Sequence, residues 1–213
     1  GLALILGGAE ATLWDVMGAY ANLADGARAA GGGANPQRRL RWLVDDAQAG
    51  GAARPISIGA AWLAQEALLG VARPADEAGW ERFAGSRQIA WKTGTSWGLR
   101  DAWAVGSSTA HTVGVWVGNA DGRGVPGLTG GSAAAPLLLA LHETLPRSPW
   151  YTTPMGALKP VQTCADDGFL ASDLCAPREA LVPARSHLDR QSPYHQVVHV
   201  EPVSGRRVNA ACE

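Results

Sequence analysis

Two segments near the start of the chain have the apolar periodicity of amphipathic helices. Between Thr12 and Gly26, apolar residues recur every three or four positions, as on one face of an α-helix. The same spacing recurs between Ser57 and Gly70. Thr12 and Ser57 are favourable N-cap residues, and glycine is a common residue just after a helix. We therefore predict one helix after Thr12 and a second after Ser57.

Two other stretches, one between these helices and one after the second helix, lack this apolar periodicity. Residues 29–35 are rich in glycine and alanine and indicate a loop, whereas residues 38–44 mix basic and apolar side chains and favour a short strand. After Arg73 and Pro74, charged and small residues continue to Ser86. We interpret that stretch as a connecting surface segment.

The pattern changes to that of β-strands at Gln88. Residues 89–96, 102–107 and 111–119 are rich in Trp, Val and Thr, and residues 97–101 between the first two have turn character. Short connections between successive strands favour antiparallel pairing of neighbours. We predict an antiparallel meander of three strands.

A third helix and a smaller terminal module follow the predicted sheet. A Gly- and Pro-rich loop at 121–131 precedes an Ala- and Leu-rich helix at 132–145, in whose first turn Pro136 is tolerated. The rest of the chain is rich in turns. We predict an α+β fold, an antiparallel sheet with flanking helices followed by a small β-rich module. The predicted organisation is a first domain at 1–148, a linker at 149–160 and the β-rich module at 161–213.

Composition excludes several classes of function. The chain has 213 residues, 46% of them hydrophobic, with 18 basic residues against 19 acidic ones. Without a basic run along any face, nucleic acid is not an expected partner. The apolar runs fall far short of the roughly 20 residues of a membrane helix, so we expect no membrane contact by this chain. It opens inside an apolar run without an initiator methionine, and we interpret it as an excerpt.

The three cysteines, Cys164, Cys175 and Cys212, allow two interpretations. A disulfide between Cys164 and Cys175 would imply an oxidising compartment, whereas free buried cysteines would suit a cytosolic protein. No cysteine has the spacing of a metal site. His195 and His199 are four residues apart, but the valines around them favour a strand, so we predict no metal site.

The segment Lys92-Thr93-Gly94-Thr95 carries the candidate chemistry. Alternation along a strand places the two threonines on one side, and Gly94 leaves the backbone open to another chain or a ligand. Lys92 offers a cation and the threonines offer hydroxyls to an anionic group. This arrangement suits a strand that pairs with an extended peptide and holds its terminal carboxylate. The alternative is an ordinary strand with a solvated lysine.

The surrounding residues resemble class A penicillin-binding proteins of the 1C type. In serine acyl-transferases of this group, Lys-Thr-Gly is the third motif, after Ser-x-x-Lys and a Ser-x-Asn type motif. The resemblance is close at 89–106, IAWKTGTSWGLRDAWAVG, and is most specific from Trp91 to Trp103. It extends over nearly the whole chain. It implies part of a penicillin-binding transpeptidase domain, which is serine β-lactamase-like, and then the small C-terminal domain of that type.

The resemblance also implies roles for the matching residues. Lys92 is expected to assist proton transfer at the nucleophile, and Thr93 and Thr95 to bind the carboxylate of the substrate or of penicillin beside Gly94. The backbone N–H of Thr95 is expected to supply half of the oxyanion hole. Trp97 and Arg100 either contact substrate or simply close the hairpin.

The first two motifs are absent, since no serine in the chain has lysine three residues later and none precedes asparagine by two. We therefore expect the excerpt to be inactive alone. Its parent is expected to be a D,D-transpeptidase on the periplasmic side of the bacterial inner membrane, with a glycosyltransferase domain upstream. The expected partners are D-Ala-D-Ala stem peptides, β-lactams and cell-wall synthesis proteins, with no cofactor. The alternative is a non-catalytic binding or scaffolding module of the cell envelope.

The resemblance extends to the terminal module. It pairs Cys164 with Cys175 around an Asp167-Gly168 turn, which implies a disulfide. Where the family usually has a cysteine before Pro-Tyr-His, this chain has Ser192. Cys212 is therefore expected to have lost its partner and to be a free thiol.

Overall fold

The computed structural model describes residues 8–29, 56–74, 79, 82 and 86–209. The predicted strand at 38–44, most of the loop at 29–35 and Cys212 lie outside the described residues. The chain forms two compact units, which divide between Ala157 and Leu158.

Two capped helices open the first unit. Helix α1 (Leu13–Arg28) begins after Thr12, whose hydroxyl accepts a hydrogen bond from the Asp15 N–H at 3.1 Å. Helix α2 (Ile58–Leu69) begins after Ser57, which caps the N–H of Ala60, and is followed by Gly70 as its C-cap. Both predicted N-caps are confirmed, and α1 continues two residues past the predicted stop at Gly26.

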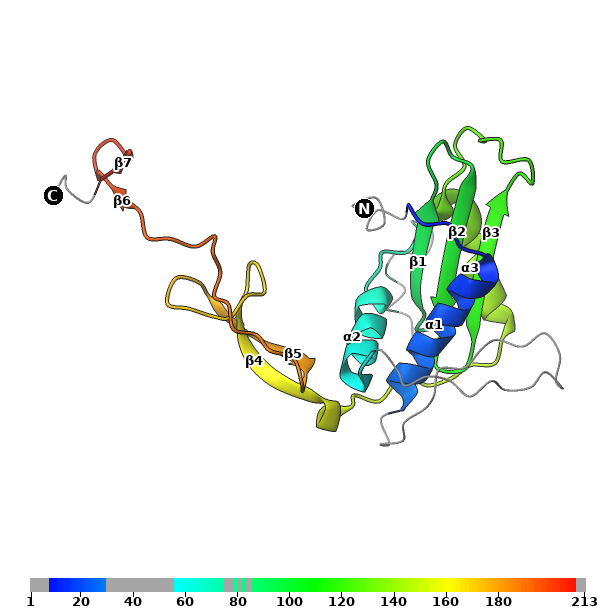
Figure 1. The fold of residues 1–213 in the computed structure, drawn as a ribbon, viewed down its shortest axis with the longest axis horizontal. Coiled ribbons are helices and arrows are strands. Elements are labelled where there is room, and N and C mark those ends of the chain that lie inside the picture. Colours follow the sequence, from blue (N-terminus) through cyan, green and yellow to red (C-terminus); the bar gives the residue numbers. More distant parts are fainter. Residues whose placement is uncertain (1–7, 30–55, 75–78, 80–81, 83–85, 210–213) are drawn as a thin grey trace. The chain divides into compact units, whose positions relative to one another are not determined.

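The predicted meander is the sheet of this unit. Strands β1 (Ala90–Thr95), β2 (Asp101–Ser107) and β3 (Thr112–Gly118) lie in the order β1-β2-β3, and both pairs are antiparallel (Figure 1). Leu13 and Met17 of α1 would meet a Cβ at Gly114 of β3 within 3 Å, so α1 packs directly against the sheet there. The three strands and their order are confirmed.

The opposite face of the sheet is covered by the third helix. The chain enters it through a π-helical turn, η4 (Gly130–Ala134), and continues as α3 (Ala135–Thr144), so the helical segment starts two residues before the predicted position. A capping box between Thr129 and Ser132 is responsible for this start, because it satisfies backbone N–H groups at the helix entrance. Helices on both faces of an antiparallel sheet confirm the α+β class.

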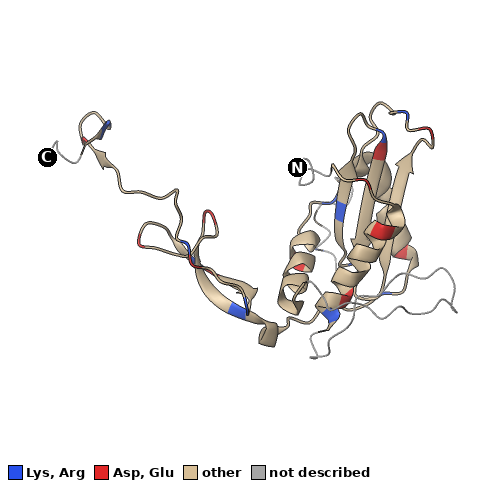
Figure 2. Ribbon diagram, in the orientation of Figure 1, with Lys and Arg blue, Asp and Glu red and all other residues tan. Residues whose placement is uncertain are grey.

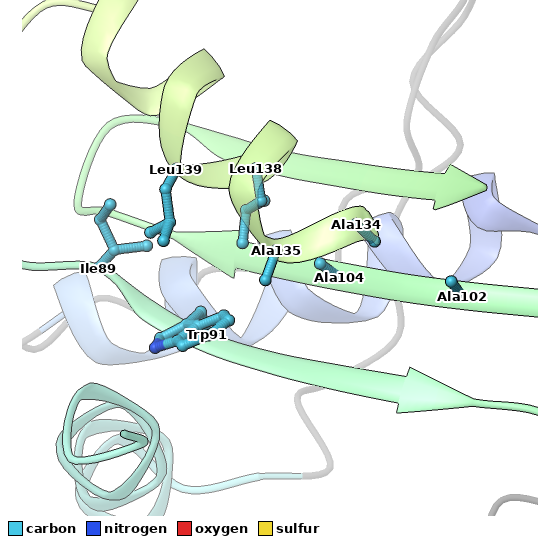
Figure 3. Packing of buried hydrophobic residues seen from close by; sticks show 8 residues of the cluster. All are labelled: Ile89, Trp91, Ala102, Ala104, Ala134, Ala135, Leu138 and Leu139. Carbon is cyan, nitrogen blue, oxygen red and sulfur yellow. The ribbon is translucent and has the colours of Figure 1, made fainter. Parts of the chain in front are cut away.

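The core lies between α3 and the sheet (Figure 3). Leu138 and the small residues of α3 and η4 pack on small residues of β2, which lets the helix approach closely. Trp91 of β1 closes one side of this cluster, and its indole N–H donates to the Val71 carbonyl at 3.3 Å. The buried members are Ile89, Trp91, Ala102, Ala104, Ala134, Ala135, Leu138 and Leu139.

The second unit is built from two small sheets. Strand β4 (Leu158–Cys164) pairs with β5 (Pro177–Pro183), and the short β6 (His199–Val200) pairs with β7 (Arg207–Val208). A short 3₁₀ turn, η5 (Met155–Ala157), precedes β4, which begins three residues earlier than the β module predicted from 161. Pro160 is tolerated there because a two-stranded sheet leaves each strand one unpaired edge.

Charged residues of both signs are dispersed along the described chain (Figure 2). Among the described residues, no helix combines the length and apolar character needed to cross a membrane.

We expect Leu138→Ala to lower the free energy of unfolding by about 2–5 kcal/mol, because it leaves a cavity where a fully buried side chain packs. Leu141→Ala, in the same helix but 48% exposed, is the matched control and should change stability by less than about 0.5 kcal/mol. Urea unfolding followed by circular dichroism measures both. Equal losses in the two variants would contradict the described core.

His142 of α3 should make folding of the first unit sensitive to mild acid. Burial lowers the pKa of its imidazole, and a hydrogen bond with the Gly106 backbone raises it in part. The charges of Arg87, His111 and Arg73 lower this pKa further, so the net shift is downward. The folded state therefore binds fewer protons than the unfolded state, and stability falls as the pH drops through the unfolded pKa of about 6.5.

The measurement is the free energy of unfolding between pH 7 and pH 5. His142→Leu should flatten this dependence, whereas His187→Gln, at an exposed position of the second unit, should leave it unchanged. An identical slope in the wild type and in His142→Leu would contradict the assignment.

Candidate functional site

Strand β1 forms an edge of the described sheet, because its only strand neighbour there is β2. The Ser96 N–H donates to the Asp101 carbonyl at 3.0 Å, so Ser96 faces β2. Residues alternate between the two sides of an antiparallel strand. The backbone N–H and C=O groups of Thr93 and Thr95 consequently face away from β2, toward the open edge.

The side chains of the Lys-Thr-Gly-Thr segment reach this edge from both faces of the sheet. Lys92 and Gly94 are exposed on the face that α1 covers elsewhere, and the Lys92 ammonium donates to the Thr93 carbonyl at 2.7 Å. Thr93, half-buried, and Thr95, exposed, lie on the other face, which carries α3. One cation and two hydroxyls therefore border an edge strand that Gly94 leaves without a side chain.

The entrance of the third helix holds this strand in place. The Gly130 N–H donates to the Thr95 hydroxyl oxygen at 3.0 Å, which leaves the hydroxyl proton of Thr95 available to an outside acceptor. A Cβ at Gly130 would lie 2.5 Å from the Gly94 oxygen and 2.6 Å from the Trp103 oxygen. Only glycine permits this approach, so η4 depends on residue 130 for its contact with the site.

The turn between β1 and β2 presents an exposed aromatic ring. Trp97 is 94% exposed, and Leu99 has a positive φ of 55°, which is unusual for a residue other than glycine. The Val125 N–H donates to the Leu99 carbonyl at 2.9 Å, so the loop after β3 supports the turn. Arg100 is also exposed. The structure thus brings Trp97 and Arg100 to the end of the same hairpin as the Lys-Thr-Gly-Thr segment.

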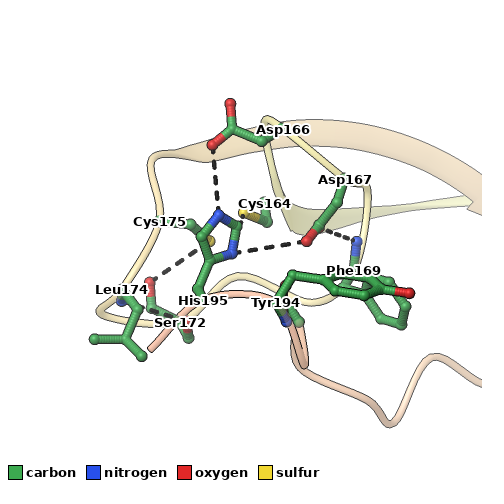
Figure 4. Close-up of polar contacts among 10 residues, drawn as sticks. Cys164, Asp166, Asp167, Phe169, Ser172, Leu174, Cys175, Tyr194 and His195 are labelled. Atoms are coloured by element: carbon green, nitrogen blue, oxygen red, sulfur yellow. Dashed lines mark hydrogen bonds and ion pairs between the residues drawn. The ribbon is translucent and has the colours of Figure 1, made fainter. Parts of the chain in front are cut away.

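The two described cysteines of the second unit lie close to His195. Cys164, buried at the end of β4, and Cys175 are free thiols in the structure. Their sulfurs and a ring nitrogen of His195 all lie within 4.8 Å of one another (Figure 4). His195 precedes β6 and is not part of a strand, so its assignment to a strand was wrong.

Sequence reasoning missed this group of three metal-ligating side chains. Its members are separated by 10 and 19 residues, so no short spacing motif connects them. The Asp167-Gly168 turn was the only local signal, and it indicated proximity of the two cysteines but not of His195.

This chain is similar in sequence to a penicillin-binding protein. It is 39% identical over 145 residues to penicillin-binding protein 1C of Escherichia coli (strain K12), an alignment that covers 68% of this chain and 17% of that protein. The chain therefore spans about one sixth of the length of this curated relative. No protein-family model matches the chain.

Among solved structures, one match to this chain is penicillin-binding protein 1A of Haemophilus influenzae. The TM-score is 0.48 at 22% identity, over 67% of this chain and 23% of that one.

Gly130→Ala should destabilise the site by about 1–3 kcal/mol, because the added methyl group overlaps two backbone oxygens. Gly131→Ala is the matched control in the same π-turn, since its added Cβ meets only the Thr129 hydroxyl at 3.9 Å. Thermal unfolding of both variants measures the difference. Equal melting temperatures would show that Gly130 does not need to approach β1 so closely.

Proposed function

We propose, from the premise that this chain belongs to the penicillin-binding proteins of the 1C type, that β1 is the substrate-binding strand of a D,D-transpeptidase domain. Sequence identity to the Escherichia coli protein supports the family, and the geometry of β1 supports the role. The observation that carries the proposal is the open edge at Gly94, bordered by one ammonium and two hydroxyl groups. An extended peptide pairs with such an edge through its backbone.

The outward backbone groups suit a D-alanyl peptide lying alongside β1. The Thr93 carbonyl already accepts from the Lys92 ammonium and keeps its second lone pair for a peptide N–H. The Thr95 N–H donates to the carbonyl oxygen that becomes negatively charged during acyl transfer. The Thr93 and Thr95 hydroxyls bind the terminal carboxylate, and the Lys92 ammonium adds a favourable charge. Lys92 also assists proton transfer at the nucleophile.

The nucleophile in this proposal is a serine of the whole protein, outside this sequence. Its oxygen attacks the carbonyl carbon of the penultimate D-alanine, and the bond to the terminal D-alanine breaks as that residue leaves with a proton. An amine of a neighbouring stem peptide then attacks the acyl-enzyme, forms the cross-link and releases the serine. A β-lactam acylates the same serine.

Trp97 and Arg100 extend this site at the end of the hairpin. An exposed indole offers a flat apolar surface to the body of a stem peptide, and a guanidinium suits a peptide carboxylate. We assign both residues to substrate contact.

The whole protein then acts in peptidoglycan synthesis on the periplasmic side of the inner membrane. Its partners are stem peptides, β-lactams and other cell-wall synthesis proteins, and glycan polymerisation belongs to a domain upstream of this sequence.

Acylation of the complete protein by a fluorescent penicillin tests the proposal. Lys92→Ala should slow labelling by about 10²–10⁴-fold, the usual range for loss of a group in proton transfer. Lys159→Ala is the matched control, since Lys159 is the other lysine of the chain and donates to the Ser186 carbonyl in the second unit. It should label like the wild type.

A second pair of variants isolates the carboxylate contact. Thr95→Val should slow acylation because it removes the hydroxyl, whereas Thr95→Ser, which retains the hydroxyl, should preserve most of the rate. Normal labelling of Lys92→Ala and Thr95→Val would contradict the site. A folded wild-type protein that never labels would favour a non-catalytic scaffold of the cell envelope.

A further inference from the structure

The group Cys164, Cys175 and His195 has the dimensions of a metal site. The Cys164 sulfur lies 3.6 Å from Nδ1 of His195. Zinc bonds of about 2.3 Å to sulfur and 2.0–2.1 Å to nitrogen, at tetrahedral angles, place these two ligand atoms about 3.5–3.6 Å apart. The ligand atom of Cys175 lies within 4.8 Å of both. A small closure of these side chains would therefore surround one ion.

Two carboxylates complete the surroundings of the His195 ring (Figure 4). Asp167 Oδ2 lies 3.7 Å from Nδ1, the nitrogen that faces the cysteines, and Asp166 Oδ2 lies 3.6 Å from Nε2 on the other side. Metal-binding histidines usually direct their second nitrogen to a carboxylate, which is the position of Asp166.

Backbone hydrogen bonds hold the three segments together. The Cys164 N–H donates to the Phe169 carbonyl at 2.7 Å, and the Cys164 carbonyl accepts from the Gly168 N–H at 3.0 Å. Ala165 bonds to Ala176 beside Cys175, and Leu170 bonds to Arg190 on the way to His195. The ligand positions are thus set by the main chain as well as by their side chains.

The second unit also has little else to stabilise it. Among its described residues only Leu158, Thr163 and Cys164 are buried. A module this small rarely folds on so small an apolar core without a disulfide or a structural metal.

We propose that Cys164, Cys175 and His195 bind one zinc ion that stabilises the second unit, with Asp167 nearest to the fourth coordination position. Two thiolates and an imidazole select zinc over magnesium or calcium, which prefer oxygen ligands. On binding, each thiol loses its proton to solvent as a zinc–sulfur bond forms and the ion releases water, so no oxidant is needed. The proposal is independent of the transpeptidase function.

Binding should weaken in acid, since the ligands must be deprotonated.

The complete protein, purified with a thiol reductant, is stripped with a chelator and supplied with zinc chloride or cobalt chloride. We expect one zinc per chain by mass spectrometry of the metal, a thiolate-to-cobalt charge-transfer band, and a rise in the melting temperature of the second unit. Cys175→Ser and His195→Gln should lose the zinc. His199→Gln, the matched control in β6, should keep it.

Asp166→Asn tests the outer carboxylate without removing a ligand. It should weaken zinc binding by about 10–100-fold, the usual effect of losing such a partner. Asp189→Asn, at an exposed position of the same unit, should leave the affinity unchanged. These variants remain informative if His195→Gln fails to fold.

The proposal is overturned if the protein binds no zinc, if cobalt binds without a thiolate band, or if His195→Gln and Cys175→Ser retain the metal. A Cys164–Cys175 disulfide in the native protein, with no metal, would also overturn it and would support the disulfide expected from the sequence.

Discussion

The approach of Gly130 to strand β1 is the contact on which the candidate site depends. The sheet edge is useful to a peptide only if β1 stays straight and its outward groups stay in register, and a free edge strand has no second strand to hold it. The hydrogen bond from Gly130 to Thr95 supplies part of that support from the helix entrance. The small residues of α3 and β2 bring the helix close enough to make it.

This arrangement explains how a candidate peptide-binding strand can lie at the edge of the described sheet. Among the described residues, η4 contacts the face that Thr93 and Thr95 share, while the outward backbone groups of these two residues pair with no second strand. Support therefore comes from one face, and the proposed peptide recognition uses the edge. The two requirements do not compete, because side chains and backbone groups of a strand point in perpendicular directions.

The second unit is stabilised by different interactions from those of the first. The first unit buries a continuous cluster between helix and sheet, whereas the second has two small sheets and few buried side chains. Its ordered feature is the convergence of Cys164, Cys175 and His195 from three segments. In a module of this size, a metal site or a disulfide can supply stability that a small core does not. Which of the two forms depends on whether the thiols bind an ion or are oxidised first.

The sequence by itself determined the local structure of the first unit. Thr12 and Ser57 predicted the starts of α1 and α2 because capping depends on neighbours three residues away. The strands of the meander were predicted from residue alternation and short turns. Alternation also placed Thr93 and Thr95 on one side of β1. The family was recognisable because the residues from 89 to 106 form one continuous segment. All of these signals act over a few residues.

Tertiary structure alone decided which distant residues meet. Gly130 contacts Thr95, which lies 35 positions earlier in the chain. The helical segment begins at Gly130, two residues before the predicted start, because of a capping box that the apolar pattern does not reveal. His195 joins the cysteines although nothing in its neighbourhood indicates them. Such contacts depend on how packed elements and turns place the chain in three dimensions, so periodicity along the sequence carries no information about them.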